Sequence, residues 1–185
     1  MKALIVVDYQ NDFITGSLGC ERAKALEQPI IDKIESYRRN GDMVVFTKDW
    51  HNADTYLTQQ EGRRLPVVHC TDDEGRGIYG RVAAYCTEEN TVRKDGFGAP
   101  DLPKMFAGRD VEEFELCGTF VTPCLMSNAI ILKCFFPEAR IVVDTKATMA
   151  VDEDIGEKAL DVMENMQIDV IRDKKAKSQV EFYRN

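Results

Sequence analysis

The chain has 185 residues, of which 44% are hydrophobic and 30% charged, and its formal net charge at pH 7 is −8. This length and composition are typical of a single globular domain with a sizeable core. The acidic balance argues against nucleic acid or an anionic membrane as a partner, because either would require a basic surface.

The first residues of the chain and the spacing of its cysteines bear on the cellular location of the protein. An apolar run of only a few residues precedes Asp8, without the apolar core or cleavage site of a signal peptide. No run approaches transmembrane length. The six cysteines are scattered and show no CxxC spacing. We therefore expect reduced thiols and a cytoplasmic location.

Apolar runs alternate with helical patterns along the chain. Strands are predicted at residues 3–7, 43–47, 91–93, 114–117, 140–143 and 168–171, and helices at 26–39, 102–107, 123–135 and 152–166. This alternation predicts a single-domain, Rossmann-like three-layer α/β/α fold with a mainly parallel six-stranded sheet. The domain is predicted over residues 1–171, with a C-terminal extension over 172–185. The polar segment 49–90 is too long for an ordinary connection and is expected to carry function.

The tripeptide Thr122-Pro123-Cys124 stands between a predicted strand and a predicted helix. Thr is a good N-cap and Pro is favoured at the first helical position, so Cys124 is expected in the first helical turn. Unpaired backbone N–H groups there would lower the pKa of the thiol and could hold an oxyanion. The alternative is a buried structural cysteine.

Other reactive groups follow other predicted strands. In a parallel sheet these carboxyl ends lie together, so Asp8, Lys94 and Cys124 could form a nucleophilic set. The carboxylate would take the thiol proton, and the lysine would stabilise both anions. Taken alone, Asp8 could be a turn residue after a strand, and a lone lysine such as Lys94 is more often a surface residue.

The only two histidines suggest a metal site. Asp49, His51 and His69 offer a carboxylate and two imidazoles, a set that suits Zn²⁺, Fe²⁺ or Mn²⁺ with open positions. Three loosely spaced ligands are a weak signal by themselves, and unrelated histidines are the alternative.

Five segments together resemble the cysteine hydrolases of the isochorismatase-like superfamily, and most closely its nicotinamidase-like branch. The resemblance covers about residues 2–171, and the order and spacing of the segments are specific together. The segments are ALIVVDYQNDF (3–13), TKDWH (47–51), PVVHC (66–70), VRKDGFGAPDL (92–102) and CGTFVTPC (117–124).

The resemblance implies a role for each of these residues. The family's catalytic Asp, Lys and Cys fall on Asp8, Lys94 and Cys124, and its metal ligands fall on Asp49, His51 and His69. Its oxyanion hole would use the amides of Phe120 and Cys124, with a cis peptide bond at Thr119-Phe120. Phe13 would supply an aromatic wall for the substrate.

The implied activity is hydrolysis of a carbon–nitrogen bond in a small linear amide. Nicotinamide would be converted to nicotinate and ammonia through a Cys124 thioester, assisted by a divalent metal, most simply Zn²⁺. The family also implies a homo-oligomer, a dimer or tetramer. Two departures bear on the substrate: Pro66 replaces an expected aromatic residue, and Phe120 replaces a small one. The alternatives are an N-carbamoyl or ureido amide as substrate, or a catalytically silent binding module.

Overall fold

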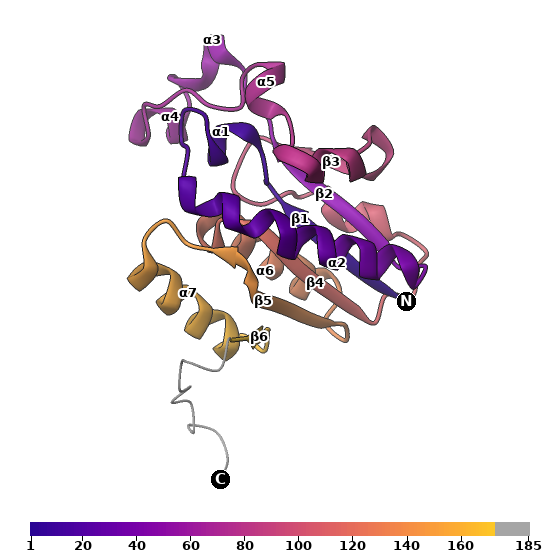
Figure 1. Ribbon diagram of the computed structural model, residues 1–185. Helices are drawn as coiled ribbons and strands as arrows, with labels where there is room; N and C mark the ends of the chain where they lie inside the picture. The colour runs from indigo at the N-terminus through magenta and orange to yellow at the C-terminus, as the bar shows by residue number, and fades with distance from the viewer. Residues whose placement is uncertain (173–185) are drawn as a thin grey trace.

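A six-stranded sheet forms the centre of the computed structural model, which describes residues 1–172 (Figure 1). Its strands are β1 (Lys2–Val7), β2 (Met43–Asp49), β3 (Thr91–Lys94), β4 (Glu113–Thr119), β5 (Arg140–Met149) and β6 (Asp169–Ile171). The α-helices are α1 (Asn11–Ile14), α2 (Glu27–Arg39), α3 (Ala53–Tyr56), α4 (Gln60–Arg64), α5 (Asp73–Arg76), α6 (Met126–Phe135) and α7 (Glu153–Asn165). Shorter helical turns are η1 (Glu21–Leu26), η2 (Gly80–Tyr85), η3 (Glu88–Asn90), η4 (Leu102–Phe106) and η5 (Val121–Leu125).

The strand order β3-β2-β1-β4-β5-β6 confirms the predicted parallel sheet, since every pair of neighbouring strands is parallel. The chain proceeds outward from β1 to β3 and then returns to place β4 on the other side of β1. Ligands of such sheets bind beyond the carboxyl ends of the strands, where the order reverses. This switch point lies between β1 and β4.

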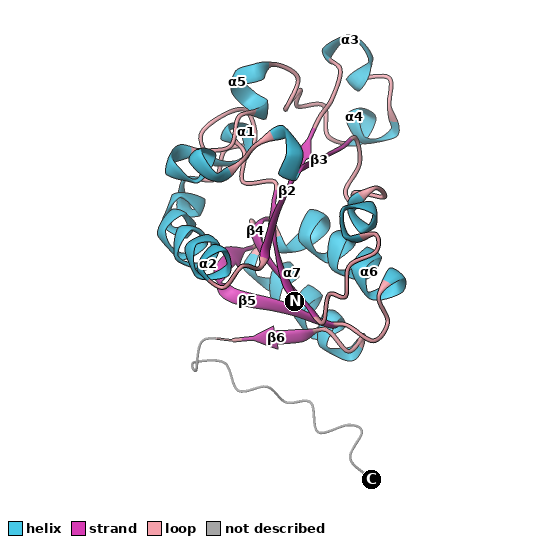
Figure 2. Cartoon of the chain, turned by 90° about the vertical axis from the view of Figure 1, so that its right-hand side faces the viewer, coloured by secondary structure: helices cyan, strands magenta, loops and turns pink. Residues whose placement is uncertain are grey.

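Helices cover both faces of the sheet and give the predicted three layers (Figure 2). Alternate residues of β1 point to opposite faces, so Ile5 packs with α6 and α7 while Leu4 packs with η1 and α2. Every residue of β1 after Lys2 is fully buried. This explains why the first strand is a continuous apolar run.

Several elements extend beyond the predicted limits. The second strand continues to Asp49 and the fourth to Thr119, and the fifth runs to Met149 although polar residues follow Val143. The segment 49–90 contains only short helices, and α3, α4 and α5 gather beyond the carboxyl ends of β1–β3 (Figure 1). None of the helices within residues 1–172 is both long enough and apolar enough to cross a membrane.

One glycine sets how closely β4 approaches β1. Gly118 has a φ of +106°, and a Cβ there would lie 2.1 Å from the carbonyl oxygen of Val7. Only glycine fits this position without shifting the backbone. The close approach brings the ends of β1 and β4 together at the switch point, directly before Asp8 and the segment that carries Cys124.

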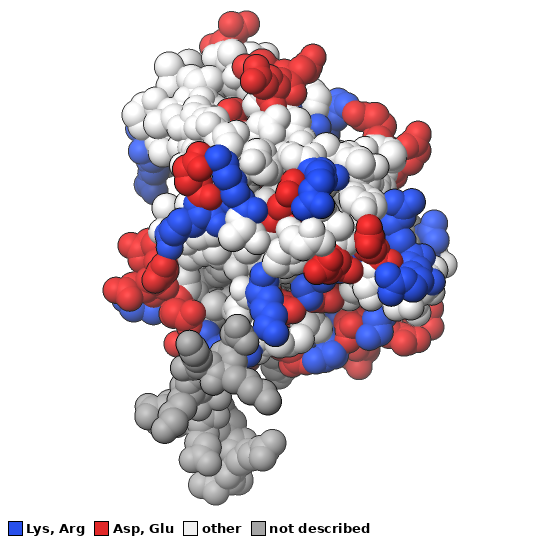
Figure 3. Space-filling model, in the orientation of Figure 1, with Lys and Arg blue, Asp and Glu red and all other residues white. Residues whose placement is uncertain are grey.

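The predicted C-terminal extension, residues 172–185, lies outside the described residues except for Arg172. The Arg172 side chain forms ion pairs with Glu157, Asp161 and Glu164 of α7. Arg172 therefore packs with the domain. On the face shown in Figure 3, Lys and Arg side chains are interspersed with Asp and Glu.

Candidate active site

Asp8 and Lys94 form an ion pair at the switch point, as the sequence predicts. Asp8 directly follows β1 and Lys94 is the last residue of β3, and both side chains are completely buried. The Lys94 ammonium lies 2.8 Å from the Asp8 carboxylate, which also accepts a 2.7 Å hydrogen bond from the Thr47 hydroxyl. Such an arrangement keeps both charges partnered away from water.

Cys124 completes this cluster. Thr122 has an extended backbone (φ −129°, ψ 138°), and helical conformation continues from Pro123 into α6. The thiol therefore lies in the first helical turn, as expected, and is 3.7 Å from the Lys94 ammonium. The peptide bond Thr119-Phe120 is cis, as the resemblance implies, and Thr122-Pro123 is cis as well.

The ionisation of the thiol differs from the sequence-based expectation. Burial raises the pKa of Cys124 well above its usual value, and the nearby Asp8 carboxylate raises this pKa further. Lys94 acts in the opposite direction but does not compensate. The expectation that the helix start lowers the thiol pKa is therefore wrong, because desolvation dominates at this depth.

The partners of Cys124 are also perturbed. Burial raises the pKa of Asp8, although the neighbouring Lys94 opposes this shift. For Lys94, burial disfavours the charged form, but the attraction of Asp8 outweighs it and the pKa is raised. At neutral pH the lysine is thus a fixed cation beside a carboxyl group and a thiol that can share one proton.

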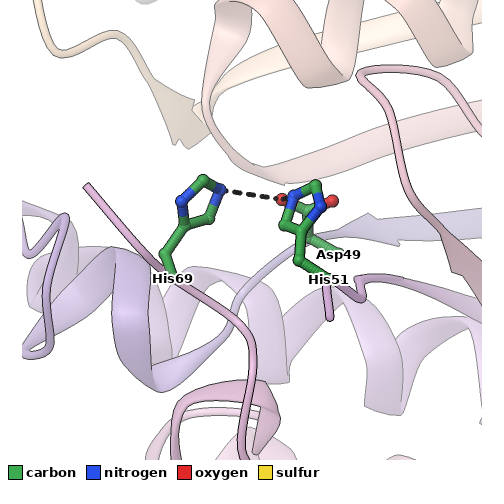
Figure 4. Close-up of side chains that lie close together, drawn as sticks. All are labelled: Asp49, His51 and His69. Carbon is green, nitrogen blue, oxygen red and sulfur yellow. Dashed lines mark hydrogen bonds and ion pairs between the residues drawn. The ribbon is translucent and has the colours of Figure 1, made fainter. Parts of the chain in front are cut away.

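Asp49, His51 and His69 form a second buried cluster (Figure 4). The Nε2 atoms of His51 and His69 lie 3.1 and 3.3 Å from one Asp49 carboxylate oxygen. Figure 4 shows both rings beside this carboxylate, and the three ligand atoms lie within 4.8 Å of one another. The cluster has the size of a single-ion site.

The chemistry of these donors fits a divalent metal. The Nδ1 atom of His69 lies 2.8 Å from the carbonyl oxygen of Val67, an arrangement that orients the ring and leaves Nε2 available as a ligand. The Nδ1 atom of His51 is buried without a hydrogen-bond partner among the described residues. Burial opposes ionisation of Asp49, but the two histidines outweigh it and hold its pKa below the usual range.

Lys94 joins the two clusters. Its ammonium lies 3.3 Å from the other Asp49 oxygen and donates to the carbonyl of Gly96 at 3.0 Å. The register places Lys94 directly opposite Asp49, since these are the last paired residues of β3 and β2. The metal-type donors and the thiol are therefore neighbours around one buried cation.

Two further residues lie beside the histidines: Glu61, which the sequence did not indicate, and Tyr56, which the sequence offered only as a possible pocket residue or a packing aromatic. A Glu61 carboxylate oxygen on α4 lies 3.8 Å from Nε2 of His69, and Glu61 also lines a cavity of about 520 Å³. Tyr56 packs edge-on against both imidazoles, with ring centroids 4.9 Å from His51 and 5.1 Å from His69. Glu61 and Tyr56 belong to short helices of segment 49–90, where the sequence shows no clear period.

Phe13, for which the resemblance implies contact with the substrate, lies beside His69. Its ring centroid is 5.6 Å from that of His69 and 6.2 Å from that of Phe120, which it meets edge-on. Phe120 contributes a large ring beside Phe13, where the resemblance implies a small residue whose backbone amide belongs to the oxyanion hole. Phe13, Phe120 and Cys124 are each less than 10% exposed.

The fold and these clusters together define a parallel α/β protein with a thiol, a carboxyl group and an ammonium at its switch point. The sequence profile of the isochorismatase domain matches residues 2–174. The chain belongs to the isochorismatase family of hydrolases.

Individual relatives agree with this assignment. An uncharacterized isochorismatase family protein, PncA of Bacillus subtilis, is 29% identical over 166 residues, covering 83% of this chain and 88% of its own. The crystal structure of the nicotinamidase/pyrazinamidase PncA from Bacillus subtilis superposes with a TM-score of 0.81 at 29% identity, covering 92% of this chain and 100% of its own. A pyrazinamidase of Pyrococcus horikoshii in complex with zinc has the same fold (TM-score 0.78, 21% identity, covering 93% of this chain and 99% of its own).

Proposed function

We propose that this chain is a metal-assisted cysteine amidohydrolase that converts nicotinamide to nicotinate and ammonia. The observation that carries the proposal is the position of Lys94, whose buried ammonium lies within 3.7 Å of Asp8, Asp49 and Cys124. Burying a cation has a desolvation cost that its partner carboxylates only offset, so its presence beside a thiol supports a role in catalysis. The similarity to a nicotinamidase/pyrazinamidase over nearly the whole chain supports an amide substrate.

The proposed reaction begins with proton transfer from the Cys124 thiol to Asp8. The thiolate attacks the amide carbonyl, and the backbone amides of Phe120 and Cys124 stabilise the negative oxygen. Asp8 returns the proton to the leaving nitrogen, so ammonia departs and a thioester remains on Cys124. Asp8 then takes a proton from water, the resulting hydroxide attacks the thioester, and the acid is released while Asp8 returns the proton to the departing Cys124 thiolate.

The pKa directions support this division of roles. A raised pKa of Asp8 brings the carboxyl group towards the range in which it can accept and return a proton near neutral pH. The pKa of Lys94 is raised, so Lys94 stays charged and stabilises the thiolate while it exists. The thiol itself is not a stable anion in the resting site, because burial raises its pKa.

Asp49, His51 and His69 would hold the metal, with Glu61 near enough to contribute a further oxygen. We expect Zn²⁺, with Fe²⁺ or Mn²⁺ as alternatives for this donor set. A bound divalent ion would supply a Lewis-acidic contact for the pyridine nitrogen of the substrate. Phe13 would then form an aromatic wall of the same pocket.

A second candidate substrate is an N-carbamoyl or ureido amide. It is favoured by one observation: a large ring, that of Phe120, stands edge-on to Phe13 with the ring centroids 6.2 Å apart, where a small side chain was expected. Pro66 also replaces the aromatic residue expected against a pyridine ring. A small, non-aromatic amide would need less room there.

The test is ammonia release by the purified, metal-loaded chain from three amides, namely nicotinamide, pyrazinamide and an N-carbamoyl amino acid. Faster release from nicotinamide and pyrazinamide would support the proposal. Release from the N-carbamoyl compound alone would replace it with the second candidate. Release from none of these amides, by protein shown to be folded and metal-bound, would contradict the amidohydrolase assignment and favour a silent binding module.

A further inference from the structure

Arg76, the last residue of α5, makes contacts that link the backbone segments of the candidate metal ligands. Its Nη2 atom donates to the carbonyl oxygen of His51 at 2.7 Å, and its Nε atom donates to that of Cys70 at 3.0 Å. Cys70 follows His69 directly in the chain. One guanidinium group therefore holds the segments that carry both imidazoles, which are far apart in sequence.

The two segments also contact each other at this point. The backbone N–H of His51 donates to the Cys70 carbonyl at 3.0 Å, so Arg76 supplies a second hydrogen bond to the same oxygen. The N–H of Cys70 in turn donates to the carboxylate of Asp12 at 2.6 Å. A rotation of either segment would break several of these bonds together.

Stacking on Trp50 fixes the orientation of the guanidinium group. The Cζ atom of Arg76 lies 4.2 Å from the centroid of the Trp50 ring, and Trp50 lies between Asp49 and His51 in sequence. The Arg76 side chain is only 15% exposed. Because the planar guanidinium is held by the ring, its two donors are directed at the two carbonyl oxygens.

Gln10 extends the same network to the third ligand. The side chain of Gln10 is fully buried, and it donates from Nε2 to the carbonyls of Asp49 (3.0 Å) and Arg76 (3.2 Å). Its Oε1 accepts a 2.7 Å hydrogen bond from the N–H of Asp49. The backbone of Asp49 is thus bound on both sides by one amide group.

From these contacts we infer that Arg76 is a positioning residue of the metal site, acting through the backbone of His51 and Cys70 and supported by Gln10. This inference rests on the proposed metal site. Outer partners of metal ligands typically contribute 10- to 100-fold to metal affinity. The substitution Arg76→Ala is therefore expected to lower Zn²⁺ affinity by about tenfold or more, although no ligand atom is removed.

Arg93 offers a matched control. Its guanidinium also lies against Trp50, at 4.0 Å from the ring centroid, but its hydrogen bond goes to Glu88 and not to the ligand segments. Arg93→Ala therefore removes the same charge and the same kind of stacking. It should leave metal affinity unchanged, whereas Arg76→Lys, which cannot span both carbonyls, should weaken it as Arg76→Ala does.

The experiment is a competition between each protein and a chromophoric chelator for Zn²⁺, with the visible spectrum of the Co²⁺-loaded protein as a second readout. Weaker binding and an altered Co²⁺ spectrum in the Arg76 variants, with Arg93→Ala like the unsubstituted chain, would support the inference. If Arg76→Ala fails to fold, Arg76→Lys provides the same comparison.

Equal affinity and identical spectra in the Arg76 and Arg93 variants would overturn the positioning role while leaving the metal site intact. An unsubstituted chain that binds neither ion would instead contradict the metal site itself, and with it both the inference and the metal-assisted part of the proposed function. The two failures are therefore distinguished by the behaviour of the unsubstituted chain.

Discussion

The ammonium of Lys94 lies 2.8 Å from the carboxylate of Asp8, and neither side chain is exposed to solvent. The ion pair forms across the sheet, because β1 and β3 are separated by β2. Cys124 approaches the pair from the other side of the switch point, 3.7 Å from the ammonium. The proposed proton transfer between thiol and carboxyl group takes place beside this fixed positive charge.

Substituting Asp8 should slow amide hydrolysis while making the Cys124 thiol more reactive towards an alkylating agent. In Asp8→Asn, amide hydrolysis should fall by about 10²- to 10⁴-fold, because the general base is lost. The pKa of Cys124 should fall, since the Asp8 charge raises it, so alkylation by iodoacetamide at neutral pH should become faster. Exposed Asp101→Asn is the control and should change neither rate. Slower alkylation in Asp8→Asn would contradict the conclusion that the Asp8 carboxylate raises the pKa of Cys124.

Removing the metal should abolish activity and a measurable part of stability. Zn²⁺ at a hundredfold excess over its dissociation constant should stabilise the fold by about 2.7 kcal/mol, observed as a higher unfolding temperature. His69→Ala should lose both this stabilisation and ammonia release. The result would go against the metal site if Zn²⁺ raised the unfolding temperature of His69→Ala as much as that of the unsubstituted chain.

The Phe120 ring should control which amides are accepted. Phe120→Ala should widen the space beside Phe13 and raise kcat/KM for larger aromatic amides relative to small ones, at a stability cost of about 3 kcal/mol. Phe106→Ala is the matched control, because Phe106 is buried against Phe114 and Phe136, outside the two clusters. It should cost similar stability without changing the order of substrates. An unchanged order in Phe120→Ala would show that the ring does not contact the substrate.

A partly buried ion network between α2 and the sheet should contribute to stability up to alkaline pH. Lys33 pairs with Glu115 at 2.5 Å and Asp144 at 2.7 Å, and although burial opposes its charge, these carboxylates raise its pKa. Its contribution is therefore complete below about pH 10.4, the unfolded value, and is lost as the pH rises through the higher folded value.

Urea unfolding as a function of pH measures this contribution. Lys33→Met should cost about 2 kcal/mol at pH 7, because it leaves two largely buried carboxylates without a cation, and the difference should shrink as the pH rises through the raised folded pKa of Lys33. The exposed pair Lys24–Glu21 offers a control, since Lys24→Met should have no measurable effect. If the difference in unfolding free energy between Lys33→Met and the unsubstituted chain stayed constant from neutral to strongly alkaline pH, the charge of Lys33 would not be the source of the stabilisation.

The fold was predictable because short apolar runs alternate with helical patterns along the chain. The buried β1 and the helical spacing of Ile30, Ile34 and Tyr37 in α2 are strong local signals. The limits of β5 were not predictable, because Asp144 to Lys146 interrupt the apolar pattern while the pairing with β4 resumes at Thr148. The residues of β5 alone do not show that its pairing with β4 resumes after an irregular segment, because that pairing depends on the partner strand.

The candidate site was predictable only in part. Residues at strand ends were found because parallel strands bring their carboxyl ends together, which is a rule of topology. The contacts of Glu61 and Arg76 depend on how segment 49–90 folds over the carboxyl ends of the strands. Its helices are too short to show a hydrophobic periodicity in the sequence. The pKa of Cys124 was predicted in the wrong direction because the helix start is visible in the sequence, whereas the depth of burial is not.

The central claim is that Cys124 is the nucleophile. The most direct measurement compares ammonia release from nicotinamide by the unsubstituted chain, Cys124→Ala and Cys134→Ala, each loaded with metal and shown to be folded. Cys134 is an exposed cysteine and serves as the matched control. The account predicts a loss of about 10⁴-fold or more in Cys124→Ala and none in Cys134→Ala. Ammonia release that survives in Cys124→Ala would contradict the thioester mechanism.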